Sequence, residues 1–170
     1  MKTAQALTTP SLKRRLACLL YEGVLLFGVV MIAGYLYSSL TQQRHAMDGR
    51  HGLQAFVFAV LAIYFTWFWS HGGQTVAMKA WHIRLVGDDG LPVGQSRALL
   101  RYLLSWLWFV PALGALALWG VRDGAAVAAI LLFGASVYAG LALLHPTRQF
   151  WHDAAVGTRL IDSQPGLATR

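Results

Sequence analysis

The stretch KRRLACLLYEGVLLFGVVMIAGYLY, residues 13–37, decides how this chain is built. Three basic residues open it, and the apolar segment that follows extends from Leu16 to Leu40. A helix needs roughly 20 apolar residues to cross a hydrocarbon core about 30 Å thick. We therefore expect residues 16–40 to form a transmembrane helix. Glu22 is the exception within it, because a charged residue at the centre of a span costs roughly 2.5–3.5 kcal/mol on insertion scales.

The rest of the chain shares this apolar character. Of its 170 residues, 56% are hydrophobic and 12% are charged, whereas soluble domains carry roughly 25% charged residues. Further apolar runs occupy residues 53–69, 102–121 and 125–144. None of the runs alternates as barrel strands do, and a helix satisfies its own backbone hydrogen bonds within lipid. The sequence therefore predicts an all-α membrane protein with four transmembrane helices.

Two features of the later runs predict local geometry. Pro111 lies within the third run and predicts a kink that frees a backbone carbonyl. In the fourth run, Ala135 and Ala139 form a pair of small residues at the spacing that lets helices approach closely. We expect this pair to serve tight packing.

The basic residues are distributed unevenly around the four runs. The formal net charge is +7, but these residues flank apolar segments, so membrane topology explains them and nucleic acid is not an expected partner. Cytoplasmic loops carry an excess of Lys and Arg, and only Arg44, Arg50 and Arg122 would face outward if the N-terminus is inside. We therefore expect both termini in the cytoplasm. The basic residues on that side would be Lys2, Lys13, Arg14, Arg15, Lys79, Arg84, Arg97, Arg101, Arg148, Arg159 and Arg170.

The segment KAWHIRLVGDDGLPVG, residues 79–94, is more than a short loop between the second and third runs. Apolar and polar residues alternate from residue 81 to residue 85, and Asp-Asp-Gly at 88–90 is a turn signal. We therefore predict a short cytoplasmic β-hairpin between helices 2 and 3, lying against the bundle or the headgroups. QSRALLRY, residues 95–102, predicts an interfacial helical turn. The candidate residues of this hairpin and interface are Lys79, Asp89, Gly90, Arg97 and Arg101.

Glu22 needs a partner, and Arg15 is a candidate on the same helix. The two residues are about two helical turns apart, so they lie on nearly the same face, with α-carbons about 10.5 Å apart. Their long side chains either lean toward each other or pair with other helices. Two interpretations of Glu22 stay open: a structural carboxylate that holds helices in register, or a group that handles a proton or an ion.

A second polar cluster follows the fourth run, in HPTRQFWHDAAVGTRL, residues 145–160. His145, His152 and Asp153 are residue types that bind zinc, but their spacing matches no compact zinc pattern, so we predict no metal and no cofactor. The sequence also lacks the common nucleophile, zinc-protease, phosphate-loop and dinucleotide motifs. The four runs contain no Asp or internal His. We therefore expect no catalytic residue and no enzyme activity.

These segments together resemble the RDD family of bacterial inner-membrane proteins, which is named for an arginine and two aspartates. Arg15 matches the arginine, Glu22 stands in place of the first aspartate, and Asp153 matches the second. The stretch GGQTVAMKAWHIRLVGDDGLPVGQSRALLR, residues 72–101, is also similar to the middle of the family pattern. The resemblance covers residues 13–162, which we take as the domain, flanked by tails 1–12 and 163–170. Its C-terminal pattern is carried by the supporting residues Arg148, His152, Gly157 and Thr158.

The resemblance implies a multi-pass protein of the bacterial inner (cytoplasmic) membrane. Some members of the family are associated with sodium/proton antiport, so we expect transport of ions or small solutes, with cation/proton exchange as one form. Four spans are few for a transport path, which predicts a homo-oligomer or a subunit of a membrane complex. The alternative is a non-transporting scaffold or accessory subunit that binds a protein or anionic lipid headgroups on the cytoplasmic side. We further predict that Arg15, Glu22 and Asp153 form one charge-linked group near the cytoplasmic face.

Overall fold

The computed structural model describes residues 8–41, 50–107, 109–121, 123–144 and 149–163. Within these ranges four helical segments are long and apolar enough to cross a membrane: Leu12–Thr41, His51–Ser70, Gln95–Trp119 and Gly124–Ala142. The prediction of a mostly helical membrane protein with four such segments is confirmed. Arg148 of the predicted motif lies outside the described residues, as do residues 1–7 and 164–170 of the predicted tails.

Helices dominate the described chain, and two short strands accompany them. In chain order the elements are α1 (Leu12–Thr41), α2 (Arg50–Ser70), α3 (Val76–Ala80), β1 (Ile83–Gly87), α4 (Gln95–Ser105), α5 (Phe109–Trp119), α6 (Gly124–Leu144), α7 (Trp151–Val156) and β2 (Thr158–Asp162).

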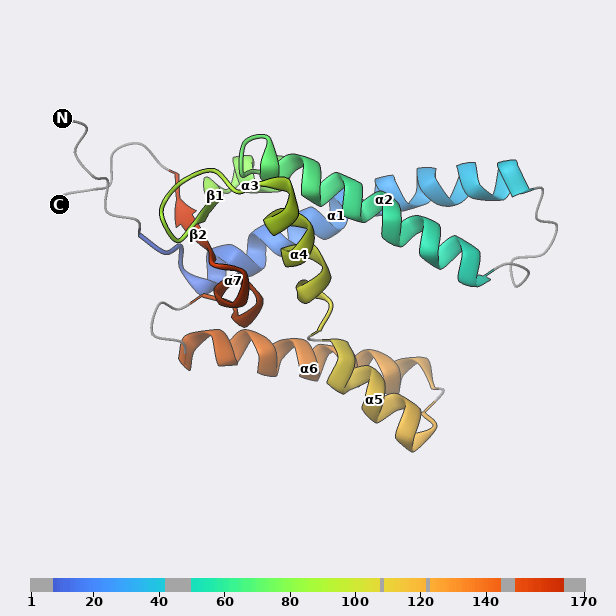
Figure 1. Ribbon diagram of the computed structural model, residues 1–170. Coiled ribbons are helices and arrows are strands. Elements are labelled where there is room, and N and C mark those ends of the chain that lie inside the picture. The colour runs from blue at the N-terminus through green and yellow to red at the C-terminus, as the bar shows by residue number, and fades with distance from the viewer. Residues whose placement is uncertain (1–7, 42–49, 108, 122, 145–148, 164–170) are drawn as a thin grey trace, which may run out of the picture.

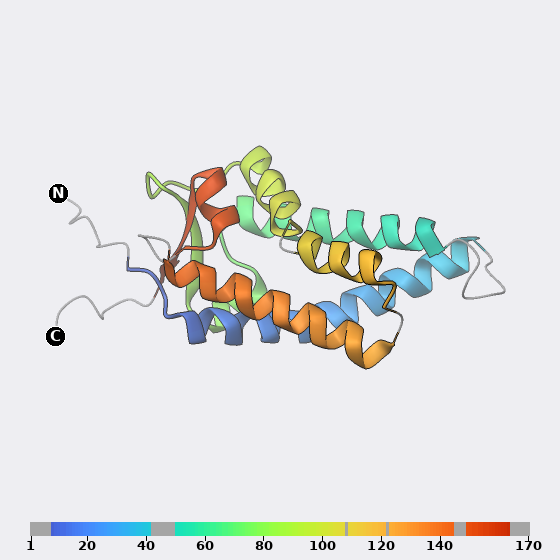
Figure 2. The same ribbon diagram turned by 90° about the horizontal axis from the view of Figure 1, so that it is seen from below.

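Two pairs of helices extend away from one end of the molecule (Figure 1). Helix α1 packs against α2, and α5 packs against α6, while α4 crosses obliquely and contacts α2. Strands β1 and β2, α3 and α7 gather where α1 begins and α2 ends, and we call this the sheet end (Figures 1 and 2). Helix α6 runs in the opposite direction to α1, from the far end of the molecule back toward the sheet end (Figures 1 and 2).

The third apolar segment is helical in two parts, because α4 ends at Ser105 and α5 begins at Phe109. Pro111 has no N–H, so it cannot donate to the carbonyl of Leu107 four residues earlier. The N–H of Val110 donates to that carbonyl instead, at 3.1 Å, and this three-residue spacing tightens the chain at the break. The predicted kink is therefore present, just before the proline. The helical segment itself begins at Gln95, earlier than the predicted start at residue 102.

The predicted β-hairpin is wrong in its strand pairing, although a two-stranded antiparallel sheet exists. Strand β1 pairs with β2, with Ile83 opposite Asp162 and Gly87 opposite Thr158. The expected turn does form, since Gly87 N donates to the Leu91 carbonyl at 2.8 Å. Pro92 then follows, and a proline without an N–H cannot continue the ladder. Strand β2, from the C-terminal part of the chain, therefore pairs with β1 in place of the segment after the turn.

The buried core is concentrated at the sheet end. Its members come from α1, α2, α3, both strands, α4 and the loop before α4: Cys18, Trp69, Ala77, Met78, Ile83, Leu85, Val93, Ala98, Tyr102 and Leu160. The long helices instead expose large apolar side chains such as Phe27, Leu118 and Phe133. Exposed apolar side chains around a helix are typical of a segment surrounded by lipid.

Candidate functional site

A cavity of about 370 Å³ lies among α1, α2, α4, α6 and α7. Its polar lining includes Arg15, Glu22, Arg101 and His152, which stand among mostly apolar and aromatic side chains. A concave apolar site with a few convergent polar groups is the usual form of a ligand-binding site. We treat this cavity as the candidate site.

Glu22 turns inward and is only 5% exposed. One carboxylate oxygen accepts a hydrogen bond from Tyr64 Oη at 2.8 Å, and the other accepts one from Thr75 Oγ1. Thr75 is fully buried and also caps α3, because its hydroxyl accepts a hydrogen bond from Met78 N at 3.2 Å. Within the described residues, no Lys or Arg lies within ion-pair distance of this carboxylate. Glu22 is therefore held by hydroxyl groups and not by Arg15.

Arg15 lines the same cavity and is 4% exposed. Its guanidinium carbon lies 4.8 Å from the centroid of the Phe150 ring, a distance typical of a cation–π contact. Its Nε and Nη1 atoms are buried and have no hydrogen-bond partner in the described part of the chain. A buried donor without a partner costs about 1–3 kcal/mol, and more when it is charged. Together with Trp69 Nε1, these two nitrogens are the buried nitrogens of the cavity lining without a hydrogen-bond partner among the described residues.

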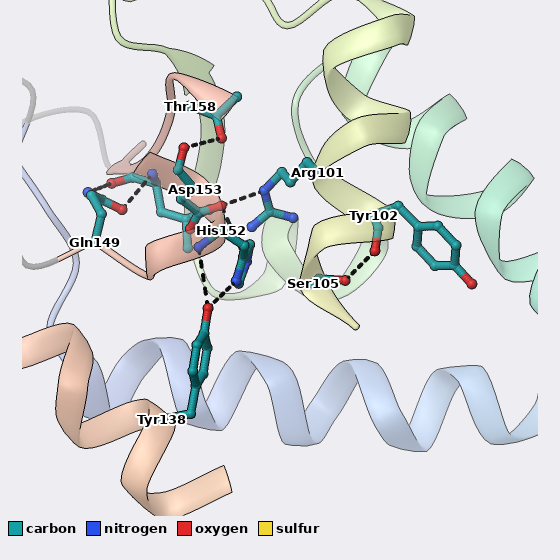
Figure 3. A network of polar contacts seen from close by, with 9 residues as sticks. Arg101, Tyr102, Ser105, Tyr138, Gln149, His152, Asp153 and Thr158 are labelled. Carbon is teal, nitrogen blue, oxygen red and sulfur yellow. Dashed lines mark hydrogen bonds and ion pairs between the residues drawn. The ribbon is translucent and has the colours of Figure 1, made fainter. Parts of the chain in front are cut away.

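Asp153 forms a buried ion pair with Arg101, at 2.6 Å between Oδ1 and Nε. Asp153 is fully buried and Arg101 is 7% exposed, and the Arg101 guanidinium lies 4.1 Å from the Trp69 ring. Figure 3 shows Arg101 reaching from α4 to Asp153 on α7. The sequence predicted Arg101 at the interface and Arg15 in a charge-linked group with Asp153. In the structure it is Arg101 that forms the ion pair with Asp153. Of the predicted group, Arg15 and Glu22 line the cavity, whereas Asp153 is not a lining residue but pairs with Arg101, which is. The three members form no direct ion pairs with one another in the described structure.

His152 connects α7 to α6 at the same site (Figure 3). Its Nδ1 lies 2.6 Å from Tyr138 Oη, and its Nε2 lies 3.4 Å from Asp153 Oδ1. Burial lowers the pKa of His152 to about 4, against the opposing attraction of Asp153 and with a smaller lowering effect from Arg101. The imidazole is therefore neutral at pH 7, and the geometry suits a proton on Nε2 that faces Asp153.

The free energy of unfolding is expected to fall by about 2 kcal/mol between pH 7 and pH 5 because of His152. An unfolded histidine titrates near 6.5, whereas the folded one does so near 4, so in this window the unfolded chain binds a proton that the folded chain does not. Unfolding curves in detergent at several pH values measure the effect, and His152→Gln should flatten it. An equal pH dependence in the His152→Gln variant would contradict this assignment.

The remaining residues of the C-terminal motif shape the chain around Asp153. Gly157 ends α7 in the left-handed conformation, with φ of 68°, which glycine adopts without strain. Thr158 is buried, and its hydroxyl donates to the Asp153 carbonyl at 3.2 Å. Gln149 was not predicted, yet its side-chain amide pairs with both backbone groups of Leu160 at 3.1 Å. This segment therefore fixes where α7 and β2 stand.

The predicted hairpin and interface residues, apart from Arg101, lie outside the cavity lining. Lys79, Asp89 and Arg97 are exposed. Asp89 Oδ1 accepts a hydrogen bond from Leu91 N at 2.9 Å, and Gly90 has a φ of 78°, so both serve the turn after β1. These residues have a structural or surface position in the described chain, and their functional role stays a prediction.

Three polar partners at the sheet end were missed in the sequence. Arg14 forms a two-pronged ion pair with Asp162 at 2.5 and 3.1 Å and so ties the start of α1 to β2. Tyr64 and Thr75 hold Glu22. Only Thr75 had a signal, because a threonine directly before a helix is a preferred cap. No group of three or more His, Cys, Asp or Glu able to hold a metal ion occurs among the described residues.

The four helical segments, each long and apolar enough to cross a membrane, place the chain in the class of membrane proteins. A family model for the RDD family matches residues 9–157, most of the chain, and the protein belongs to that family. The matched range contains Arg15, Glu22 and Asp153, while strand β2 lies just beyond it. Comparisons with curated proteins and with solved structures give no match.

Proposed function

We propose that this protein transports ions or small solutes across a bacterial cytoplasmic membrane, with cation/proton exchange at Glu22 as the specific form. The observation that carries the proposal is the environment of Glu22. The carboxylate is buried in a helix long enough to span the membrane and borders the cavity. Its partners are two hydroxyl groups, with no Lys or Arg within ion-pair distance in the described chain. An ionisable group at membrane depth without a countercharge is suited to take up a proton or a cation.

The neighbours of Glu22 supply the ligands that such an exchange requires. Tyr64 Oη and Thr75 Oγ1 add oxygen atoms beside the carboxylate, and hard cations prefer oxygen ligands. Binding a proton neutralises the carboxylate, and binding a cation does the same, so the two occupants compete for one site. The excess of basic residues orients the sheet end and both termini toward the cytoplasm. Because the chain has few spans for a complete path, we propose that a homo-oligomer or a larger membrane complex is the working form.

Proton flux in liposomes tests this proposal. Purified protein is reconstituted with a pH-sensitive dye inside, and a sodium or potassium gradient is applied. We expect Glu22→Gln to lower cation-driven proton flux at least tenfold, because the amide cannot exchange a proton or neutralise a cation. Glu22→Asp, which restores the residue of the family pattern, should keep measurable flux.

Asp89→Asn is the matched control, because Asp89 is an exposed carboxylate in the turn after β1. It should leave the flux unchanged. Size-exclusion profiles and unfolding curves establish that each variant is folded before its flux is compared. Equal flux in Glu22→Gln and in the unchanged protein would overturn the exchange proposal.

A second candidate function is that of a non-transporting accessory subunit that contacts anionic headgroups. Lys79, Arg84 and Arg97 favour it, because all three are exposed on α3, β1 and α4. A basic residue near an anionic membrane surface contributes about 1 kcal/mol of attraction. No cation-driven flux from correctly assembled protein, together with vesicle binding that is lost when these three residues become glutamine, would favour this function.

A further inference from the structure

A second hollow lies on the outward face of α1, next to the cavity. This hollow is lined by Leu16, Leu19, Leu20, Gly23, Val24 and Phe27. Leu16, Leu19 and Gly23 also line the cavity. Leu20, Val24 and Phe27 are exposed, as expected for side chains in contact with lipid. The cavity and the lipid-facing hollow therefore border the same residues of α1.

The wall opposite α1 is made by small side chains of α6. Ala135 and Ala139 line the cavity, so their small side chains leave space between α6 and α1. Gly134 makes the close contact between helices instead, since a Cβ there would lie 3.3 Å from Ala112 Cβ on α5. Away from Arg15, Glu22 and Tyr138, the cavity lining from α1 and α6 is thus apolar.

Arg15 is the arginine of this cavity that makes no direct ion pair among the described residues. The charge of Arg101 is balanced by Asp153 at 2.6 Å, and both oxygens of Glu22 are engaged by hydroxyl groups. His152 and Tyr138 are titratable groups that also face the cavity near Phe150. Arg15 Nε and Nη1 are buried and have no hydrogen-bond partner within the described ranges. A guanidinium presents its N–H groups as a planar fork that matches a carboxylate or a phosphate.

We propose that the cavity binds an anionic lipid by one acyl chain, with the charged headgroup on Arg15 and the chain along the apolar wall between α1 and α6. The volume of about 370 Å³ is near the lower end of ligand pockets, roughly 300–1,000 Å³, and so suits one chain and not a whole two-chain lipid. The headgroup supplies the acceptors that Arg15 lacks, and the chain fills an apolar space that borders the lipid-facing hollow on α1. This binding does not depend on whether the protein transports anything.

Binding to the full-length protein in neutral detergent micelles tests the proposal. The probes are palmitate and lysophosphatidate, which place a carboxylate or a phosphate on one chain, and methyl palmitate, which has the chain without the charge. We expect saturable binding of at least one charged probe and at least tenfold weaker binding of the methyl ester. Preference for palmitate or for lysophosphatidate identifies a fatty acid or a phospholipid as the source. Inorganic phosphate and acetate should not compete at equal concentrations, because they lack the chain.

Two variants locate the binding site within the protein. Arg15→Gln should weaken binding of the charged probe at least tenfold, whereas Lys13→Gln, which removes an exposed basic residue outside the cavity, should not. Ala139→Leu fills the chain-binding space without touching the charge and should also weaken binding at least tenfold. It keeps the test decisive if Arg15→Gln does not fold. Equal affinity for the ester and the acid, or unchanged binding in Ala139→Leu, would overturn the proposal.

Discussion

Asp153→Asn is expected to destabilise the folded protein by about 3 kcal/mol, because it leaves the Arg101 charge buried without a partner. Breaking a buried ion pair by removing one member typically costs about 3–5 kcal/mol, and the asparagine oxygen recovers part of one hydrogen bond. Arg101 is only 7% exposed, and its remaining contact is with the Trp69 ring. Reversible unfolding in mixed detergent micelles measures the loss. The same change should loosen α4 from α7, since the ion pair joins them.

A matched control and a double-mutant cycle separate this ion pair from a general effect of charge. Asp88→Asn changes an aspartate whose side chain is 62% exposed and whose ion pair with Arg159 is long, at 3.7 Å. Such surface pairs contribute about 0–1 kcal/mol. Arg101→Gln combined with Asp153→Asn should cost clearly less than the sum of the two single changes, by about 1 kcal/mol or more. Additive costs, or a cost for Asp153→Asn no larger than that for Asp88→Asn, would speak against the ion pair as the main contact.

The membrane helices could be predicted from the sequence because length and apolarity are local properties. A run such as residues 16–40 needs no knowledge of its neighbours to be recognised as a span. The break before Pro111 was predictable for the same reason, since the missing N–H acts within one helical turn. Glu22 was singled out by the cost of a carboxylate in an apolar run. Its burial and its place on the cavity wall agree with the expectation that it faces the bundle.

The partners of the charged residues could not be predicted, because they depend on contacts between distant segments. Arg15 and Arg101 both precede apolar runs, and nothing local distinguishes the one that reaches Asp153. The structure resolves the choice through α7, which places Asp153 against α4. Strand β1 shows the same limit. Its alternating pattern and turn signal predicted a strand but not its partner, since at the Gly87–Thr158 pair strand β2 lies 71 residues further along the chain.

Gly73→Ala is expected to destabilise the protein by at least about 2 kcal/mol, because glycine is required there in two respects. Its φ is 70°, a left-handed conformation that costs a residue with a Cβ about 1–3 kcal/mol. A Cβ would also lie 2.3 Å from the carbonyl oxygen of Leu85, a backbone atom that cannot move aside without disturbing β1. The close approach exists because Leu85 N donates to the Gly73 carbonyl at 2.7 Å. Unfolding in mixed micelles measures the loss.

Gly72→Ala provides the control one residue away, because a Cβ at Gly72 would meet no atom within 4 Å and its φ is not in the left-handed range. It should change the free energy of unfolding by no more than about 0.5 kcal/mol, the usual range for surface changes. The contrast also bears on Glu22, since Gly73 sets the path of the chain into Thr75, whose hydroxyl donates to that carboxylate. If the close approach of Gly73 to β1 positions Thr75, Gly73→Ala should lower cation-driven flux in the protein that remains folded, and Gly72→Ala should not. Equal stability of the two variants would mean that the contact between Gly73 and β1 is not needed to hold this loop.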